Sequence, residues 1–156
     1  MTPKKLWLTL AAVIIGSFAV LGFYGVEIFR EMPPFPNKVV TEKGETLFEG
    51  QDIKDGQNVW QSIGGQTVGS VWGHGSYVAP DWTADYLHRE SLLMLTALAK
   101  KEGKVYSRLS EAEKAKYQVL LKEELRRNTY DPATGIITYS ELRANVAREL
   151  SRYYAE

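Results

Sequence analysis

An uncharged apolar stretch near the N-terminus constrains this chain more than any other feature. Leu6 to Val26 reads LWLTLAAVIIGSFAVLGFYGV and contains no Asp, Glu, Lys or Arg. Coiled into an α-helix, a run of this length spans roughly 30 Å, the thickness of the hydrocarbon core of a bilayer. The sequence therefore predicts one N-terminal transmembrane helix that carries a water-facing domain.

The charges around this stretch predict its orientation. Lys4 and Lys5 precede it, and nothing equally basic follows it closely. By the positive-inside rule, the N-terminus lies in the cytoplasm and the rest lies outside the inner (cytoplasmic) membrane, in the periplasm or the extracellular space. A cleaved signal peptide is the alternative, but the run is longer than a typical signal-peptide core, and no A-x-A-like site follows it.

Composition limits what the remaining residues can do. The chain has 156 residues, so the part outside the membrane is long enough for one domain and too short for two. Its acids and bases nearly balance, and a neutral domain lacks the basic surface that nucleic-acid binding needs. The absence of cysteine excludes disulfides, thiolate metal sites, iron–sulfur clusters and covalent haem c held by C-x-x-C-H.

The pattern along the chain predicts a mostly α-helical domain with one small β-hairpin. Residues 1–29 form the anchor, 30–38 a proline-rich spacer, and 39–156 the soluble domain. The hairpin is expected at 39–40 and 46–48. Four helices follow. The first is Gln51–Ile63, with Ile53, Val59, Trp60 and Ile63 as a buried stripe. The second is capped by Asp81 and runs to about Lys101, the third opens with a Ser110–Glu113 capping box and ends near Arg127, and the last opens with Ser140 and Glu141.

Several charged residues have ordinary structural interpretations. Asp81 and Asp85 favour the dipole of the helix that they open and need no other function. The runs at 100–104 and 111–117 are predicted to be solvated helix faces.

The segment Gly64–Pro80, GGQTVGSVWGHGSYVAP, is a glycine-rich loop that invites a functional explanation. Glycines let a ligand or another chain approach the backbone closely. A phosphate loop is disfavoured because no G-K-[ST] follows Gly73-His74-Gly75. A metal site built on His74 and His88 lacks a third partner at ligand spacing. The remaining interpretation is a docking surface for a partner protein or its cofactor.

The residues in and after this loop resemble a known family. WGHGSYVAPDWTADYLHRE, residues 72–90, is similar to the periplasmic N-terminal segment of quinol-dependent nitric oxide reductases, and GQNVWQSIGGQTVGS before it fits the same segment. The resemblance is specific over residues 56–90 and loose after about 105. It implies a cytochrome c-like α-helical domain that has lost its haem.

Related cytochrome c-dependent enzymes have a small subunit with one membrane helix and a haem c domain. Alignment on the G-x-G-x-Y-x-A-P stretch puts Gly65 and Val68 where those relatives have the haem-binding cysteines, and Gly69 where they have the haem-ligating histidine. The resemblance thus implies that this chain binds no haem. Trp60, Trp72 and Trp82 are candidates to fill the vacated cavity.

The resemblance also implies cofactors shared with a partner. In the relatives, backbone carbonyls matching those of Gly75 and Tyr77 bind a calcium ion at the subunit interface, next to haem propionates. His74 is a candidate contact to a haem propionate or to quinol. The many-helix catalytic partner would hold haem b, haem b3 and a non-haem iron, none of which this chain can ligate.

The resulting hypothesis is a non-catalytic, membrane-anchored small subunit, or N-terminal segment, of a quinol-dependent nitric oxide reductase. The complex would use quinol electrons to reduce two NO to N2O and water, as denitrifying enzymes do, and this chain would cap its outer face. The ending ELSRYYAE favours a separate subunit. Two alternatives stay open: the same module in an NO-disproportionating relative, and a stand-alone anchored assembly or binding protein.

Overall fold

The computed structural model describes residues 2–71, 73 and 81–156, of which 67% are helical. Contacts divide the chain into two units, residues 1–34 and 35–156, and each is described by itself. The mostly α-helical fold class predicted from the sequence is confirmed.

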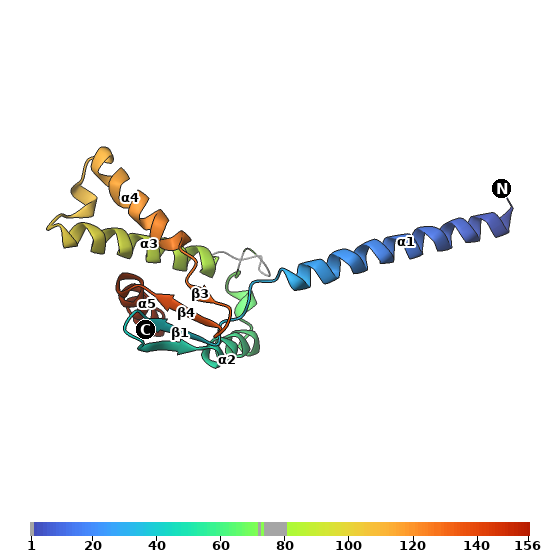
Figure 1. The fold of residues 1–156 in the computed structure, drawn as a ribbon, viewed down its shortest axis with the longest axis horizontal. Helices are drawn as coiled ribbons and strands as arrows, with labels where there is room; N and C mark the ends of the chain where they lie inside the picture. Colours follow the sequence, from blue (N-terminus) through green and yellow to red (C-terminus); the bar gives the residue numbers. More distant parts are fainter. Residues whose placement is uncertain (1, 72, 74–80) are drawn as a thin grey trace. The chain divides into compact units, whose positions relative to one another are not determined.

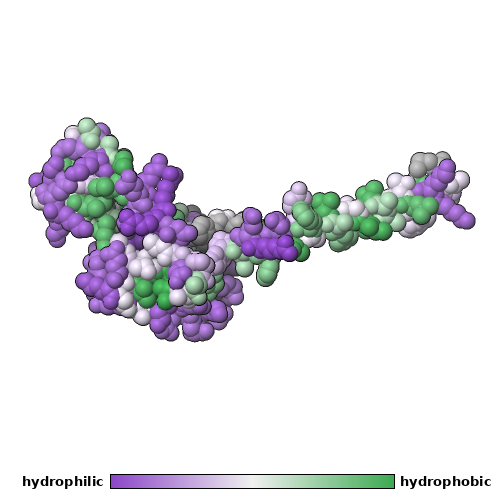
Figure 2. Space-filling view, viewed as in Figure 1, coloured by the Kyte–Doolittle hydropathy of each residue, from purple (hydrophilic) through white to green (hydrophobic). Residues whose placement is uncertain are grey.

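The first unit is the single helix α1 (Pro3–Arg30), which has proline in its first turn and buries none of its residues. It is long and apolar enough to cross a membrane. Figure 2 shows apolar residues along its middle and hydrophilic residues towards both ends. This helix is compatible with a single-pass membrane anchor.

The second unit combines helices with a small sheet (Figure 1). Its elements in chain order are β1 (Lys38–Thr41), β2 (Thr46–Glu49), α2 (Gly50–Ser62), the 3-10 helix η1 (Gly65–Thr67), α3 (Trp82–Lys101), the 3-10 helix η2 (Tyr106–Arg108), α4 (Glu111–Arg126), β3 (Tyr130–Asp131), β4 (Ile136–Tyr139) and α5 (Glu141–Ala155).

The sheet is larger than the sequence predicts. The expected hairpin is present as β1 and β2, but four strands pair in the order β2-β1-β4-β3. β1 runs parallel to β4, with Lys38 opposite Ile136 and Thr41 opposite Tyr139, and β3 pairs antiparallel with β4. The residues DPATG at 131–135 predict the turn between β3 and β4. The pairing of β1 with β4 joins strands so distant in the chain that it leaves no local pattern.

Asn37, which directly precedes β1, joins the start of that strand to the β3–β4 turn. Its backbone N–H donates to the carbonyl of Gly135 at 2.8 Å, and its side-chain amide donates to the carbonyl of Thr134 at 3.1 Å. Gly135 has φ of 70°, and a β-carbon on it would overlap the Asn37 side chain. Only glycine meets both requirements, so the β3–β4 turn is fixed against the start of the domain.

Three helix starts predicted from the sequence are confirmed. Asp81 accepts a hydrogen bond from the backbone N–H of Ala84 and caps α3. Ser110 and Glu113 form the predicted capping box of α4, and Ser140 caps α5. Each cap satisfies a backbone N–H that has no partner within the helix.

α3 organises the core because it packs on both α4 and α5. One buried cluster faces α5, and a second faces α4. Burying a valine, leucine or methionine side chain stabilises the fold by about 1.5–3 kcal/mol. The clusters consist of Met94, Val146 and Leu150, and of Leu95, Ala99 and Tyr117.

The predicted buried stripe of α2 is wrong. Val59 and Ile63 are exposed, and Ile53 and Trp60 are only partly buried. Helical spacing shows which residues share a face, but it does not show whether another element covers that face.

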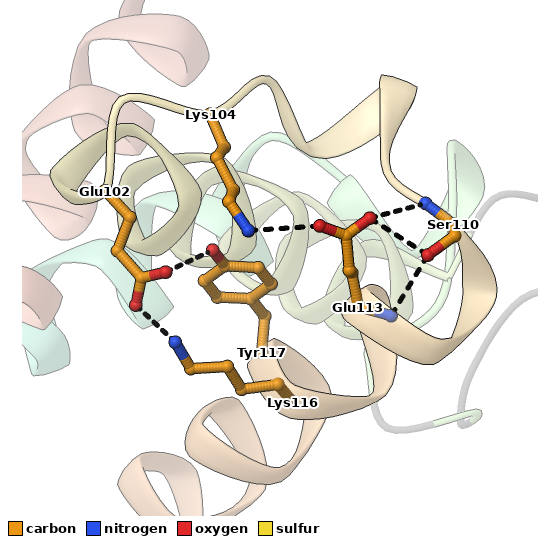
Figure 3. A network of polar contacts seen from close by, with 6 residues as sticks. All are labelled: Glu102, Lys104, Ser110, Glu113, Lys116 and Tyr117. Atoms are coloured by element: carbon orange, nitrogen blue, oxygen red, sulfur yellow. Dashed lines mark hydrogen bonds and ion pairs between the residues drawn. The ribbon is translucent and has the colours of Figure 1, made fainter.

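The charge runs at 100–104 and 111–117 are more than solvated faces (Figure 3). Lys104 pairs with Glu113 at 3.0 Å, and Lys116 pairs with Glu102. Tyr117, inside the second run, is buried and donates its hydroxyl hydrogen bond to Glu102 at 2.9 Å. The two runs therefore hold the α3–α4 connection together.

Candidate functional site

The loop predicted as a docking surface is described only in part. The structure covers residues 64–71 and residue 73. His74, Gly75 and Tyr77 lie outside the described residues, as does Trp72. The calcium carbonyls of Gly75 and Tyr77 and the contact of His74 therefore stay predictions.

Asp81 ties the middle of this loop to the start of α3. One of its carboxylate oxygens accepts hydrogen bonds from the Ser70 hydroxyl at 2.7 Å and from the backbone N–H of Gly73. The other oxygen accepts the capping bond from Ala84 at 2.8 Å. The backbone N–H of Trp82 also donates to the Ser70 carbonyl at 2.8 Å. One carboxylate thus starts α3 and brings Ser70 to the end of the loop.

These bonds favour the ionised form of the Asp81 carboxylate. The hydrogen bond from Ser70 contributes most to lowering its pKa below the ordinary value, followed by those from Ala84 and Gly73. The sequence identified Asp81 as a helix cap, but not as the clamp of the loop, because the Ser70 contact depends on how the loop returns.

A glycine turn shapes the first part of the loop. Gly64 adopts a left-handed conformation with φ of 69° immediately after α2, as glycine does at helix C-termini. Gly65 follows and is buried beneath the indole of Trp60, where a β-carbon would overlap the ring. The chain therefore needs glycine at both positions, for conformation at the first and for space at the second.

Two of the three tryptophans predicted to fill a vacated haem cavity lie together. The rings of Trp60 and Trp82 meet edge to face, with centroids 6.4 Å apart. Of the other positions aligned with haem-binding residues, Gly69 is buried and Val68 is exposed. Trp82 Nε1 is buried without an acceptor among the described residues.

His88 lies exposed on α3. Among residues 2–71, 73 and 81–156, no group of three His, Cys, Asp or Glu side chains could hold a metal ion. His88 therefore has no metal-binding partners in the part of the chain that the structure describes.

Asp85 has a structural role that the sequence did not reveal. Its carboxylate accepts hydrogen bonds from Arg89 Nε at 2.8 Å and from the Tyr154 hydroxyl at 2.7 Å. The Arg89 guanidinium lies 4.1 Å from the centroid of the Tyr153 ring. These contacts lower the pKa of Asp85 and fasten the end of α5 to the first turns of α3.

A buried ion pair that the sequence did not reveal joins α3 to α5. Glu90 is 1% exposed, and its Oε1 accepts a hydrogen bond from Arg143 Nε at 2.9 Å. The Arg143 guanidinium in turn lies 4.3 Å from the centroid of the Tyr139 ring. Glu90 follows Tyr86 by four residues and precedes Met94 by four, so it lies on a stripe that includes the buried Met94. This helical spacing is the signal in the sequence that predicts burial of Glu90.

This geometry forms a support around the first turns of α3. α3 and its cap carry the clamp at Asp81, the tie at Asp85 and the buried pair at Glu90, all within three helical turns. Each of these carboxylates is engaged by a partner from another part of the domain. The described part of the domain is thus suited to holding the glycine-rich loop in place.

Comparison with known proteins identifies the class of protein to which this support belongs. Residues 36–156 match the family model for the NorB cytochrome c-like domain of nitric oxide reductase. The match covers the whole second unit except Phe35, so the chain belongs to this family. Curated proteins provide no match. Family membership makes the chain a component of a nitric oxide reductase, an oxidoreductase complex, and implies a catalytic partner.

Proposed function

We propose that this chain is the non-catalytic, membrane-anchored component of a quinol-dependent nitric oxide reductase and caps the catalytic part on the outer face of the membrane. The family match over residues 36–156 carries the proposal. The apolar helix α1 supports anchoring, and Lys4 and Lys5 before it support a cytoplasmic N-terminus.

Two observations support a domain without haem. The chain has no cysteine, so it cannot attach haem c through thioether bonds. The Trp60 indole also occupies the space in front of Gly65, where a cysteine side chain would begin. Without a redox centre in this domain, electrons from quinol pass directly to the haem of the catalytic partner.

The proposal includes a calcium ion bound by the backbone carbonyls of Gly75 and Tyr77. Calcium accepts carbonyl oxygens, so such a site needs no acidic cluster from this chain. The Asp81 clamp supports this role because it brings together Ser70 and Gly73 on one side of the segment and Trp82 on the other. The ion's function would be to neutralise propionates where two protein surfaces meet.

Co-purification tests the proposal. The tagged full chain, extracted from its native membrane in mild detergent, should bring with it haem b, haem b3, non-haem iron and calcium, and should give no haem c spectrum. Recovery of the chain without any haem would contradict a role in a nitric oxide reductase. It would favour the alternative of a stand-alone assembly or binding protein.

Analysis of the reaction products distinguishes NO reduction from the alternative of NO disproportionation. The purified complex supplied with quinol and NO should consume quinol and form N2O. An NO-disproportionating relative would instead consume NO without oxidising quinol. Gly75→Val, tested in the same complex, should reduce calcium content and association, because its side chain would obstruct close approach to the backbone. Unchanged calcium content and activity would contradict the calcium site.

A further inference from the structure

Four exposed apolar side chains follow one another along the chain from the end of α2 into the glycine-rich loop. They are Val59 and Ile63 from the last turns of α2, Val68 after η1 and Val71, and together we call them the apolar α2 surface. Their exposed fractions are 58%, 72%, 56% and 40%. Single exposed apolar side chains are ordinary, but four within thirteen residues of chain form a group that water solvates poorly.

The local structure holds these side chains outwards. Val59 and Ile63 are four residues apart and share one face of α2. Gly64 then reverses the chain, with Thr67 donating its hydroxyl hydrogen bond to the Gly64 carbonyl at 2.7 Å. Trp60 turns instead towards Gly65 and Trp82. The domain thus partly covers the neighbouring tryptophan and leaves the aliphatic residues uncovered.

The stretch of chain that carries this surface contains no charged residue, and Asp55, one helical turn before Val59, is the nearest charge along α2. Residues 56–80 contain no Asp, Glu, Lys or Arg, although 24% of the chain is charged. Depletion of charged residues distinguishes the buried centre of a protein–protein interface from ordinary surface. An anionic lipid surface would instead attract lysine and arginine, which this segment lacks.

We infer that the apolar α2 surface docks onto an uncharged, apolar patch on the outer side of the catalytic part of the nitric oxide reductase. This inference rests on the proposed function, since it takes the catalytic part as the occupant. Val68 and Val71 belong to the proposed docking loop itself, so one partner can cover that loop and the end of α2. Docking removes four aliphatic side chains from water, and this burial favours association.

Cysteine probes test the inference because the wild-type chain contains none. Val59→Cys places one thiol in the apolar α2 surface. Val119→Cys is a matched control, since Val119 is also a helical valine and is 55% exposed on α4. Maleimide labelling of each variant is compared between the full chain alone and the haem-bearing complex, both in mild detergent.

Assembly should slow labelling of Val59→Cys about tenfold, because an interface centre excludes water. Val119→Cys should label at the same rate in both states. Val59→Lys should weaken association about tenfold, as expected for a charge placed in a buried interface, whereas Val119→Lys should leave association unchanged. Thermal unfolding of both lysine variants should match that of the wild type.

Several outcomes would overturn the inference. If Val59→Cys labels freely in a haem-bearing complex, or if both thiols are equally protected there, the apolar α2 surface is not the docking site. The proposed function would still stand. Protection of Val59→Cys by a second copy of the chain, or by phosphatidylcholine vesicles without the partner, assigns the surface to another occupant. If the wild type retains no haem-bearing partner, both proposals fail.

Discussion

The indole of Trp60 lies directly against the α-carbon of Gly65, with no room for a β-carbon between them. This contact joins the end of α2 to η1, and the ring of Trp82 at the start of α3 meets the same indole edge to face. Three separate elements therefore meet around one glycine. The arrangement makes the absence of a side chain at residue 65 a structural requirement.

Gly65→Ala should consequently destabilise the domain. Forcing a methyl group into a filled space costs about 1–3 kcal/mol of the free energy of unfolding. Thermal unfolding of the full chain in mild detergent, followed by tryptophan fluorescence, would measure the loss. Gly56→Ala is the control: it lies in α2 with open space around it and should gain about 0.5–1 kcal/mol. The double variant Gly65→Ala/Trp60→Leu should recover part of the loss, and a fully stable Gly65→Ala would refute the contact.

Arg143→Met should lower the free energy of unfolding more than Gly65→Ala does. It leaves the buried carboxylate of Glu90 without its charged partner, and breaking a buried pair in this way costs about 3–5 kcal/mol. Glu90→Gln should cost less, since the amide oxygen can still accept from Arg143 Nε. Replacing both residues by methionine should be less damaging than Arg143→Met alone, which a comparison of the three unfolding free energies would test. If the double variant is the least stable of the three, the pair does not behave as a coupled unit.

Asp81 gives the domain a specific sensitivity to acid. Its folded-state pKa is lowered, chiefly by the hydrogen bond from Ser70, so the ionised form contributes stability above its unfolded pKa of about 4. That contribution is lost as the pH falls through the lower folded-state pKa. Asp81→Asn should therefore melt below the wild type at pH 6, and the difference should shrink below about pH 4. A difference in melting temperature that is constant with pH would show that ionisation of Asp81 contributes nothing.

Two tyrosines with raised pKa values should make the folded domain less stable in alkali. Burial, with the charge of Glu90, raises the pKa of Tyr86 to about 12, and burial with the hydrogen bond to Asp85 raises that of Tyr154 to about 12. Since both folded values exceed the unfolded value of about 10, their contribution is complete below pH 10 and is lost as the pH rises towards 12.

The ultraviolet absorbance of tyrosinate measures this titration. The wild type should show a late-titrating fraction, and Tyr86→Phe or Tyr154→Phe should each reduce it by one residue. Tyr154→Phe should also loosen the end of α5, because Asp85 loses the hydrogen bond from the Tyr154 hydroxyl. Complete titration of all tyrosines near pH 10 in the folded protein would contradict the partly buried environment of Tyr86 and the hydrogen bond from Tyr154 to Asp85.

Local signals explain why much of the fold was predictable. Helix caps such as Asp81 and Ser110 act within three residues, so the sequence alone reveals them. The β1–β2 hairpin likewise forms around a short turn. By contrast, the parallel pairing of β1 with β4 and the buried pair of Glu90 and Arg143 join distant segments, and no local pattern shows which distant partner each segment takes.

The candidate site also combines features that the sequence reveals with features that only the structure reveals. The glycine content of residues 64–80 and the resemblance around them identified the loop, but its clamp at Asp81 emerged only from the structure. The stripe on α2 was predicted to be buried and is exposed, because no described element covers Val59 and Ile63. The exposure of these two side chains supports the proposed docking surface.

By itself, the sequence determined that the chain has one helix fit to cross a membrane, a domain without cysteine-bound cofactors, and a family resemblance that the comparison of residues 36–156 bears out at the level of nitric oxide reductase. These properties depend on hydrophobicity, residue chemistry and local order. Only the tertiary structure decided which charges are buried, which aliphatic face stays open and why residue 65 must be glycine. Each of those depends on which distant segments the fold brings into contact.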